Sequence, residues 1–91
     1  MSGPKNRDSV FEPEFRDDIK FWLKSDRKIL VRIFELVEAT MRDPFTGIGK
    51  PEPMRHIGAD IWSRRVTQEH RIIYKVRDDR VNFLQARFHY K

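Results

Sequence analysis

The chain has 91 residues, of which 38% are apolar and 36% charged, and it contains no cysteine. This length suits one small soluble domain, and the lack of cysteine excludes zinc fingers, disulfide frameworks and cysteine hydrolases. The net charge is +5, from 19 basic and 14 acidic side chains. Residues 1–45 hold nine of each sign, whereas residues 46–91 hold ten basic and five acidic. This basic second half indicates a polyanionic partner without identifying it.

The first seven residues are polar and have no apolar periodicity, so they are predicted to form a flexible tail before a single domain over residues 8–91. Val10 and Phe11 form a candidate short strand. The sequence has neither an apolar run of about 20 residues nor a hydrophobic segment at its start that could direct secretion. We therefore expect a cytoplasmic protein.

Two amphipathic helices are predicted next, because apolar residues recur with helical spacing from Phe15 to about Arg42. Ser25 or Asp26 interrupts the pattern, and either residue can cap the second helix. Asp43-Pro44 ends that helix, since proline disfavours helical geometry in the residue before it. The two short-linked helices are expected to form a hairpin.

The apolar period then changes from helical to alternating. Residues 44–53 are rich in glycine and proline and are predicted to form a loop. Four strands are predicted, over residues 54–57, 61–67, 71–76 and 81–89, and their short connections favour antiparallel hairpins. The order predicts an α+β domain, with an N-terminal helical hairpin packed on a twisted antiparallel sheet of four to five strands.

Alternation along the strands sorts side chains by sheet face. The face toward the helices is expected to carry Ile72, Tyr74, Val76, Leu84, Ala86 and Phe88. The open face is expected to be basic and to carry Arg65, Arg71, Lys75, Gln85, Arg87 and His89, with Phe83 as its aromatic residue. Arg64 is expected at the rim of the sheet or paired with a carboxylate. Such an open face is a candidate phosphate-binding surface.

A carboxylate, a histidine and several arginines are the groups that metal-free cleavage of RNA requires. A base removes the proton of the 2′-hydroxyl, cations stabilise the charged phosphorus, and an acid protonates the leaving 5′-oxygen. His89 suits the acid, because histidine ordinarily titrates near neutral pH. Glu52 is held stiffly between two prolines but is a weak base. From the residues alone, a histidine such as His89 is more often an exposed surface residue, and Glu52 can simply be a loop carboxylate.

Three segments resemble the YoeB (Txe) branch of the RelE-type toxins of bacterial toxin–antitoxin systems. They are residues 44–53 (PFTGIGKPEP), 61–74 (IWSRRVTQEHRIIY) and 87–90 (RFHY). The resemblance runs from about Asp17 to Tyr90, which is most of the chain. It implies the fold of small microbial ribonucleases, and cleavage of messenger RNA in the ribosomal A site without a metal or other cofactor.

The resemblance also implies roles for the residues that match its motifs. Glu52 is implied as the general base, Arg71 as the group that stabilises the scissile phosphate, His89 as the general acid, and Tyr90 as a residue that positions substrate or leaving group. Lys50, Arg55 and Arg65 match basic positions near the RNA or ribosome, and the strand pattern adds Lys75 and Arg87. The chain departs from the family in its N-terminal extension, in Lys91, and in the turn at residues 58–60.

These patterns predict the toxin of a type II pair, a ribosome-dependent endoribonuclease that halts translation. Three alternatives stay open: a ribosome-independent ribonuclease, a non-catalytic RNA- or ribosome-binding module, and a protein whose basic face mainly binds its antitoxin. The expected partners are messenger RNA on the ribosome and a small, acidic, YefM-like antitoxin that folds on binding. A homodimer is a further open alternative.

Overall fold

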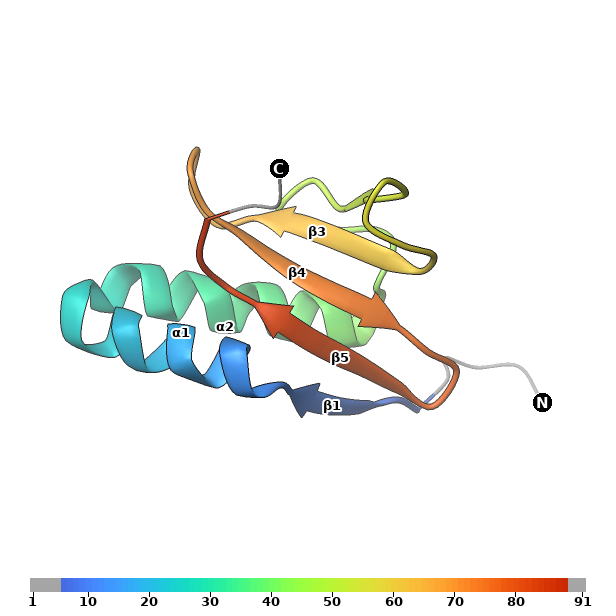
Figure 1. The fold of residues 1–91 in the computed structure, drawn as a ribbon, viewed down its shortest axis with the longest axis horizontal. Coiled ribbons are helices and arrows are strands. Elements are labelled where there is room, and N and C mark those ends of the chain that lie inside the picture. The colour runs from blue at the N-terminus through green and yellow to red at the C-terminus, as the bar shows by residue number, and fades with distance from the viewer. Residues whose placement is uncertain (1–5, 89–91) are drawn as a thin grey trace.

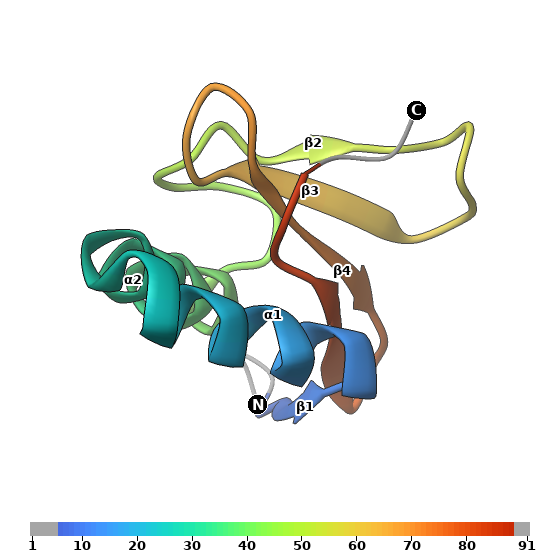
Figure 2. The same ribbon diagram turned by 60° about the vertical axis from the view of Figure 1, so that its left-hand side comes forward.

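The computed structural model describes residues 6–88. The elements in chain order are β1 (Asp8–Phe11), α1 (Pro13–Ser25), α2 (Arg27–Arg42), β2 (Glu52–Pro53), β3 (Ile61–Arg65), β4 (Arg71–Val76) and β5 (Arg80–Gln85). The strands form one five-stranded sheet in the order β1-β5-β4-β3-β2. The two helices lie side by side against one face of this twisted sheet (Figures 1 and 2). The α+β class, with a helical layer on a sheet, is therefore confirmed.

The helices begin and end where local chemistry favours it. Pro13 opens α1, where its fixed backbone angle suits the first turn and its missing N–H costs nothing. Asp26 separates the helices and caps α2, because its Oδ1 accepts hydrogen bonds from the backbone N–H groups of Lys28 (3.0 Å) and Ile29 (3.4 Å). Asp43 is the C-cap of α2 and precedes Pro44. The predicted hairpin is thus observed, and Asp26 rather than Ser25 is the cap.

The sheet differs from the prediction at both ends of its order. β3, β4 and β5 pair antiparallel as expected, but β1 pairs parallel with β5, with Val10 opposite Asn82. The sheet is therefore mixed, because both helices lie between these two strands in the chain and permit a parallel crossover. At the other edge, residues 52–53 form the strand, whereas residues 54–57 form a turn in which Ile57 N–H donates to the carbonyl of Met54 (2.9 Å).

A β-bulge changes which side chains of β5 face the helices. Tyr74 pairs with Phe83 and Ile73 pairs with Gln85, so Leu84 is an extra residue in β5. Phe83 is consequently buried in the core, and Leu84 is only half-buried. The predicted positions of both side chains are wrong, because strict alternation over residues 81–89 ignores the extra residue. Gln85 pairs with Ile73 and therefore lies on the face away from the helices, as predicted.

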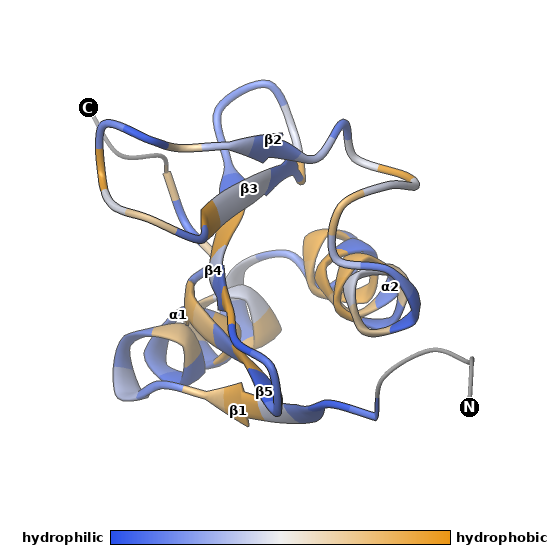
Figure 3. Cartoon of the chain, turned by 90° about the vertical axis from the view of Figure 1, so that its right-hand side faces the viewer, coloured by the Kyte–Doolittle hydropathy of each residue, from blue (hydrophilic) through white to orange (hydrophobic). Residues whose placement is uncertain are grey.

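The core lies between the sheet and the helices. Its buried side chains come from both layers and include Phe15, Ile33, Leu36, Tyr74 and Phe83. Phe15 and Phe83 contact each other with ring centroids 5.4 Å apart, which packs α1 directly on β5. Hydrophobic residues are visible on both helices and on β1 and β4 (Figure 3). Because the helices cover one face, the opposite face of β2, β3 and β4 is free to carry a functional site.

Candidate active site

The open face carries an ion pair between Glu52 and Arg71. Nη1 of Arg71 donates to Oε1 of Glu52 at 2.6 Å and to Oγ of Ser63 at 2.9 Å. Ser63 is fully buried, whereas the side chains of Arg71 and Glu52 are 20% and 57% exposed. Within residues 6–88, Nε and Nη2 of Arg71 have no hydrogen-bond partner. Among the described residues the guanidinium is thus anchored through one nitrogen, and its other two nitrogens are available to bind a ligand.

Strand register brings these three residues together. Glu52 pairs with Ser63 across β2 and β3, and Ser63 pairs with Ile73 on β4. Side chains two residues apart on a strand point to the same face, so Arg71 lies beside this row. The register therefore places the carboxylate, hydroxyl and guanidinium on one face although they come from three strands.

The loop before β2 is shaped by residues with positive φ. Gly47, Gly49 and Lys50 have φ angles of 112°, 83° and 51°. Gly49 passes close to the core, since an added Cβ would lie 2.7 Å from Cδ2 of Leu36. Its carbonyl accepts a hydrogen bond from Arg65 N–H at 2.7 Å, which ties the loop to β3. These contacts fix the approach of the chain to Glu52.

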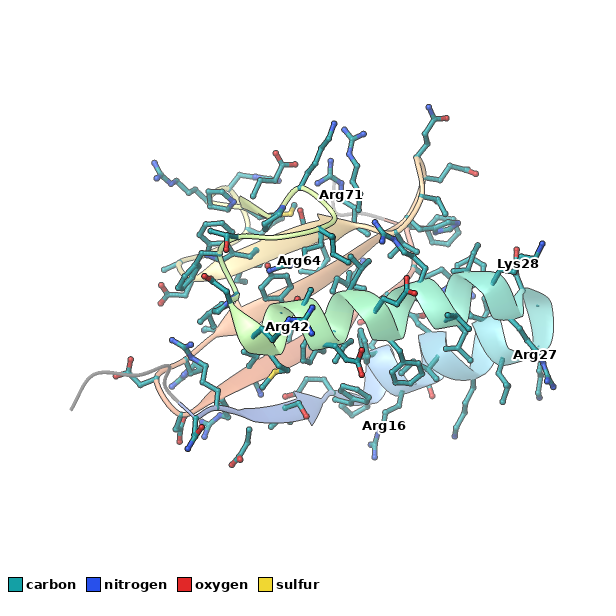
Figure 4. The ribbon with its side chains drawn as sticks, turned by 180° about the vertical axis from the view of Figure 1, so that it is seen from behind. Arg16, Arg27, Lys28, Arg42, Arg64 and Arg71 are labelled. Carbon is teal, nitrogen blue, oxygen red and sulfur yellow. The ribbon has the colours of Figure 1, made fainter. Side chains whose placement is uncertain are left out.

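Arg64 holds the same loop from inside the protein. Its side chain is fully buried and donates to the carbonyls of Asp43 (2.6 Å), Thr46 (2.8 Å) and Ile48 (2.9 Å), and to Oη of Tyr74 (3.2 Å). Figure 4 shows Arg64 between the sheet and α2, and Arg71 on the far side of the sheet. The prediction of a rim position or a carboxylate partner is therefore wrong. The guanidinium is buried because backbone carbonyls, which sequence patterns do not reveal, satisfy its donors.

The buried hydroxyl next to Arg64 belongs to Tyr74. It donates to the carbonyl of Pro44 at 2.7 Å and accepts from Arg64. Burial raises the pKa of Tyr74, and the hydrogen bond and charge of Arg64 only partly oppose this effect. At the start of the loop, hydrogen bonds from Phe45 N–H and Thr46 lower the pKa of the Asp43 carboxyl.

The predicted basic residues are only partly gathered on the open face. Arg65 pairs with Arg71 across β3 and β4, and Lys75 lies on the same face further along β4. Lys50 and Arg55 are exposed and flank β2 in the chain. Lys50 and Arg55 are therefore close to Glu52 in the chain, whereas Arg65, Arg71 and Lys75 share its sheet face.

Arg87 is not on the open face. Its guanidinium carbon lies 3.9 Å from the ring centroid of Phe21 on α1, which is a cation–π contact. The predicted placement is wrong because the strand ends at Gln85, and alternation has no meaning beyond it. His89 and Tyr90, the predicted acid and positioning residue, lie outside the described residues, as does Lys91.

Residues that the sequence analysis did not select hold the chain just before His89. Ala86 N–H donates to Oδ2 of Asp18 (2.8 Å), and its carbonyl accepts from Nε1 of Trp22 (2.9 Å). Phe88 N–H donates to Nδ1 of His70 (2.8 Å). Burial raises the pKa of the Asp18 carboxyl despite the hydrogen bond from Ala86. The only sequence signal for this arrangement is the position of His70 directly before Arg71, within the family-like segment 61–74.

Within residues 6–88, no group of three or more His, Cys, Asp or Glu side chains is placed to hold a metal ion. Neither α1 nor α2 is long and apolar enough to cross a membrane.

Comparisons with known proteins agree on one family. A model of the "YoeB-like toxin of bacterial type II toxin-antitoxin system" matches residues 11–90. Toxin YoeB of Mycobacterium bovis is 49% identical, over 88% of this chain and 94% of that protein. Toxin YoeB of Escherichia coli K12 is 43% identical, over 89% and 96%. A YoeB/ParE toxin structure from Agrobacterium tumefaciens is 40% identical, covers 91% of this chain and 99% of its own, and has a TM-score of 0.86. The YoeB dimer structure from Staphylococcus aureus is 31% identical, covers 93% and 99%, and has a TM-score of 0.85.

The family match spans the loop before Glu52, the strands that carry Ser63 and Arg71, and the segment up to Tyr90. The sheet, the helical layer and the motifs thus agree with the sequence comparisons, and the chain belongs to the YoeB family of toxins of bacterial type II toxin–antitoxin systems.

Proposed function

We propose that this toxin is an endoribonuclease that cleaves messenger RNA in the ribosomal A site and thereby inhibits translation. The observation that carries the proposal is the Glu52–Arg71 ion pair, anchored on buried Ser63 in the one sheet face that the helices leave uncovered. A carboxylate beside a guanidinium whose Nε and Nη2 bind no residue within 6–88 suits both proton removal and phosphate binding. His89 and Tyr90 complete the site in this proposal.

The proposed reaction is an internal transesterification of the RNA backbone. Glu52 takes the proton of the 2′-hydroxyl, and the 2′-oxygen attacks the adjacent phosphorus. The bond to the 5′-oxygen breaks, and His89 donates a proton to that oxygen as it leaves. The products are a 2′,3′-cyclic phosphate and a 5′-hydroxyl end, with Arg71 binding the phosphate oxygens whose charge increases in the transition state.

In the proposed site, Arg71 and Glu52 bind each other and each also contacts the RNA. In the free protein the carboxylate of Glu52 lies against Nη1 of Arg71, and Ser63 holds the same nitrogen from below. Nε and Nη2 are then the donors for a phosphate, which a guanidinium binds with two parallel hydrogen bonds. Glu52 is the more exposed partner, so it is accessible to a ribose hydroxyl. Lysine at position 71 would not reproduce this geometry.

Basic residues near the ion pair extend the surface for RNA. Lys50, Arg55, Arg65 and Lys75 add positive charge around Glu52 and along β4. Each contact with a phosphate releases counterions, so binding is expected to weaken as salt increases.

The proposed protein partner is an antitoxin with an acidic segment that covers the open face. Solved structures of relatives include a YoeB–YefM complex from Staphylococcus aureus and a YoeB dimer from the same organism. By that similarity we propose a YefM-like antitoxin for this chain, together with self-association into a dimer. Covering Glu52 and Arg71 would block RNA from the site, which explains inhibition without a change of fold.

The test is cleavage of a translated message by the purified protein, with new 5′ ends mapped by primer extension. Wild type is expected to cut within the A-site codon, whereas Glu52→Gln, Arg71→Lys and His89→Ala are each expected to cut at least tenfold more slowly. Arg27→Gln is the matched control, because it removes an exposed cation of α2 on the helical side and should cut at the wild-type rate.

The other possible results either contradict the proposal or indicate one of the alternative functions. A message that wild type leaves intact, or cutting that the three site variants do not slow, contradicts the proposal. Salt-sensitive binding without new ends would indicate the non-catalytic RNA-binding module. Equal cutting of free RNA and ribosome-bound message would indicate the ribosome-independent ribonuclease.

A further inference from the structure

His70 lies where the turn after β3 meets the end of the described chain. Its ring contacts Trp22 on α1, with centroids 4.7 Å apart and planes at 80°, and Phe88, with centroids 5.1 Å apart. Nδ1 accepts the backbone N–H of Phe88 at 2.8 Å. A backbone N–H can only donate, so Nδ1 is the acceptor in this contact.

Phe88 needs an external constraint to keep its conformation. Its φ angle is 60°, in the left-handed region that bulky residues rarely adopt. Its side chain is 54% exposed, so burial of the ring does not account for the conformation. The backbone is instead held on both sides, because Phe88 N–H donates to His70 and the Phe88 carbonyl accepts from Arg71 N–H at 3.0 Å. Of these two hydrogen bonds, only the one to His70 involves a side chain.

The residues before Phe88 are held by α1 and by one another. Asp18 and Trp22 bind the N–H and the carbonyl of Ala86. Nε2 of Gln85 donates to the carbonyl of Arg87 at 3.1 Å, and the Arg87 guanidinium packs on Phe21. The last described residues run from beside α1 toward β3 (Figure 2). The chain up to Phe88 is therefore fixed, and His70 provides the last of these side-chain contacts before His89.

We infer that His70 is a positioning residue, whose Nδ1 accepts the Phe88 N–H, fixes the backbone of Phe88 next to Arg71 and so sets the point from which the chain continues to His89 and Tyr90. The inference rests on the proposed function, since it matters for activity only if His89 is the general acid. Displacing an acid by about 1 Å can slow a reaction roughly 100-fold without changing substrate affinity. His70 therefore acts on the chemical step rather than on RNA binding.

Two substitutions separate the acceptor of His70 from its ring. His70→Asn keeps an acceptor, because Oδ1 of asparagine occupies nearly the position of Nδ1 of histidine, but it loses the ring contacts. His70→Phe keeps a ring against Trp22 and Phe88 but has no acceptor. Purified proteins would be compared in steady-state cleavage of ribosome-bound message, with urea unfolding to show that both variants are folded.

The expected result is a lower kcat for His70→Phe, by roughly 10- to 100-fold, with KM within about threefold of wild type. His70→Asn should recover at least tenfold of that loss. Equal kcat in wild type and His70→Phe would overturn the inference, and so would the reverse order of the two variants, which would assign the effect to ring packing.

A second readout does not depend on activity. Hydrogen exchange of the Phe88 amide is expected to be slow in wild type and His70→Asn and at least tenfold faster in His70→Phe, because the amide loses its acceptor. An exchange rate that His70→Phe does not change would overturn the inference even if wild type cuts RNA. If wild type does not cut the message, the proposed function fails, and the exchange rates still decide whether His70 holds Phe88.

Discussion

Replacing Arg64 tests how the loop before Glu52 is held. Arg64→Met keeps much of the aliphatic volume of the side chain but removes every donor. The carbonyls of Asp43, Thr46 and Ile48 then lose their partner, and Oη of Tyr74 loses a donor. These three carbonyls belong to the loop that leads to Glu52, so the substitution acts on the site from the core side.

The expected cost follows from these contacts. Hydrogen bonds from a charged donor contribute about 1.5–3 kcal/mol each, and the removal of a buried charge recovers part of that sum. Thr46 and Ile48 are exposed, so their carbonyls can bind water once the loop relaxes. We therefore expect Arg64→Met to lower the free energy of unfolding by about 3 kcal/mol, out of roughly 5–15 kcal/mol for a domain. The melting temperature should fall by roughly 12–24 °C.

Urea unfolding followed by circular dichroism measures this change. Arg64→Lys should fall between wild type and Arg64→Met, because an ammonium group has three donors in a different geometry. Arg65→Met is the matched control, since the neighbouring side chain is exposed and should change stability by less than about 0.5 kcal/mol. An Arg64→Met protein within about 1 kcal/mol of wild type would refute the role assigned to the buried guanidinium.

Three further predictions concern stability and titration. Gly49→Ala should lower the free energy of unfolding by roughly 2 kcal/mol in urea, because φ is 83° and the new Cβ would lie 2.7 Å from Cδ2 of Leu36; an unchanged urea midpoint would contradict this. Absorbance at 295 nm should show a tyrosine that ionises above the ordinary range, and Tyr74→Phe should remove that step, since burial raises the pKa of Tyr74. Folding also raises the pKa of Asp18 above 3.8, so the folded protein binds a proton more tightly than the unfolded chain, and this group's contribution to stability declines as pH rises through the raised value. The free energy of unfolding of Asp18→Asn should therefore rise relative to that of wild type as the pH increases from 3 to 7. A difference between the two proteins that stays constant over this range would contradict the raised pKa.

Local periodicity predicted both helices and the strands β3, β4 and β5, whereas β2 lies at residues 52–53 and not at the predicted 54–57. The apolar stripes of both helices and the alternation in β3 and β4 follow from burial on one face, so the helical hairpin and the antiparallel strands were predicted correctly. The parallel pairing of β1 was not, because its partner β5 is about 70 residues away and four residues of strand carry no signal for direction. The extra residue at Leu84 also has no local signal, and it reversed the predicted face of Phe83.

Site residues that match a sequence motif could be predicted from the sequence. Residues whose role depends on strand register or on contacts with backbone carbonyls could not. Glu52 and Arg71 were selected from the sequence, and the structure places their side chains 2.6 Å apart. Ser63 was not selected, because its role depends on register. Arg64 was misplaced because its partners are carbonyls of a loop, and Arg87 because the strand ends two residues earlier. The contact of His70 with Phe88 joins residues 18 positions apart in the chain and required the fold.

The nucleophile in the proposed reaction is the 2′-hydroxyl of the message, and replacing it tests the central claim most directly. Two ribosome-bound messages would be compared, identical except for one 2′-deoxy nucleotide at the cleavage position of the A-site codon. The proposed mechanism predicts that wild-type protein cuts the all-ribose message, leaves a 2′,3′-cyclic phosphate, and leaves the deoxy-substituted message uncut at that position. Cutting of the deoxy-substituted message at the same position and rate would contradict it.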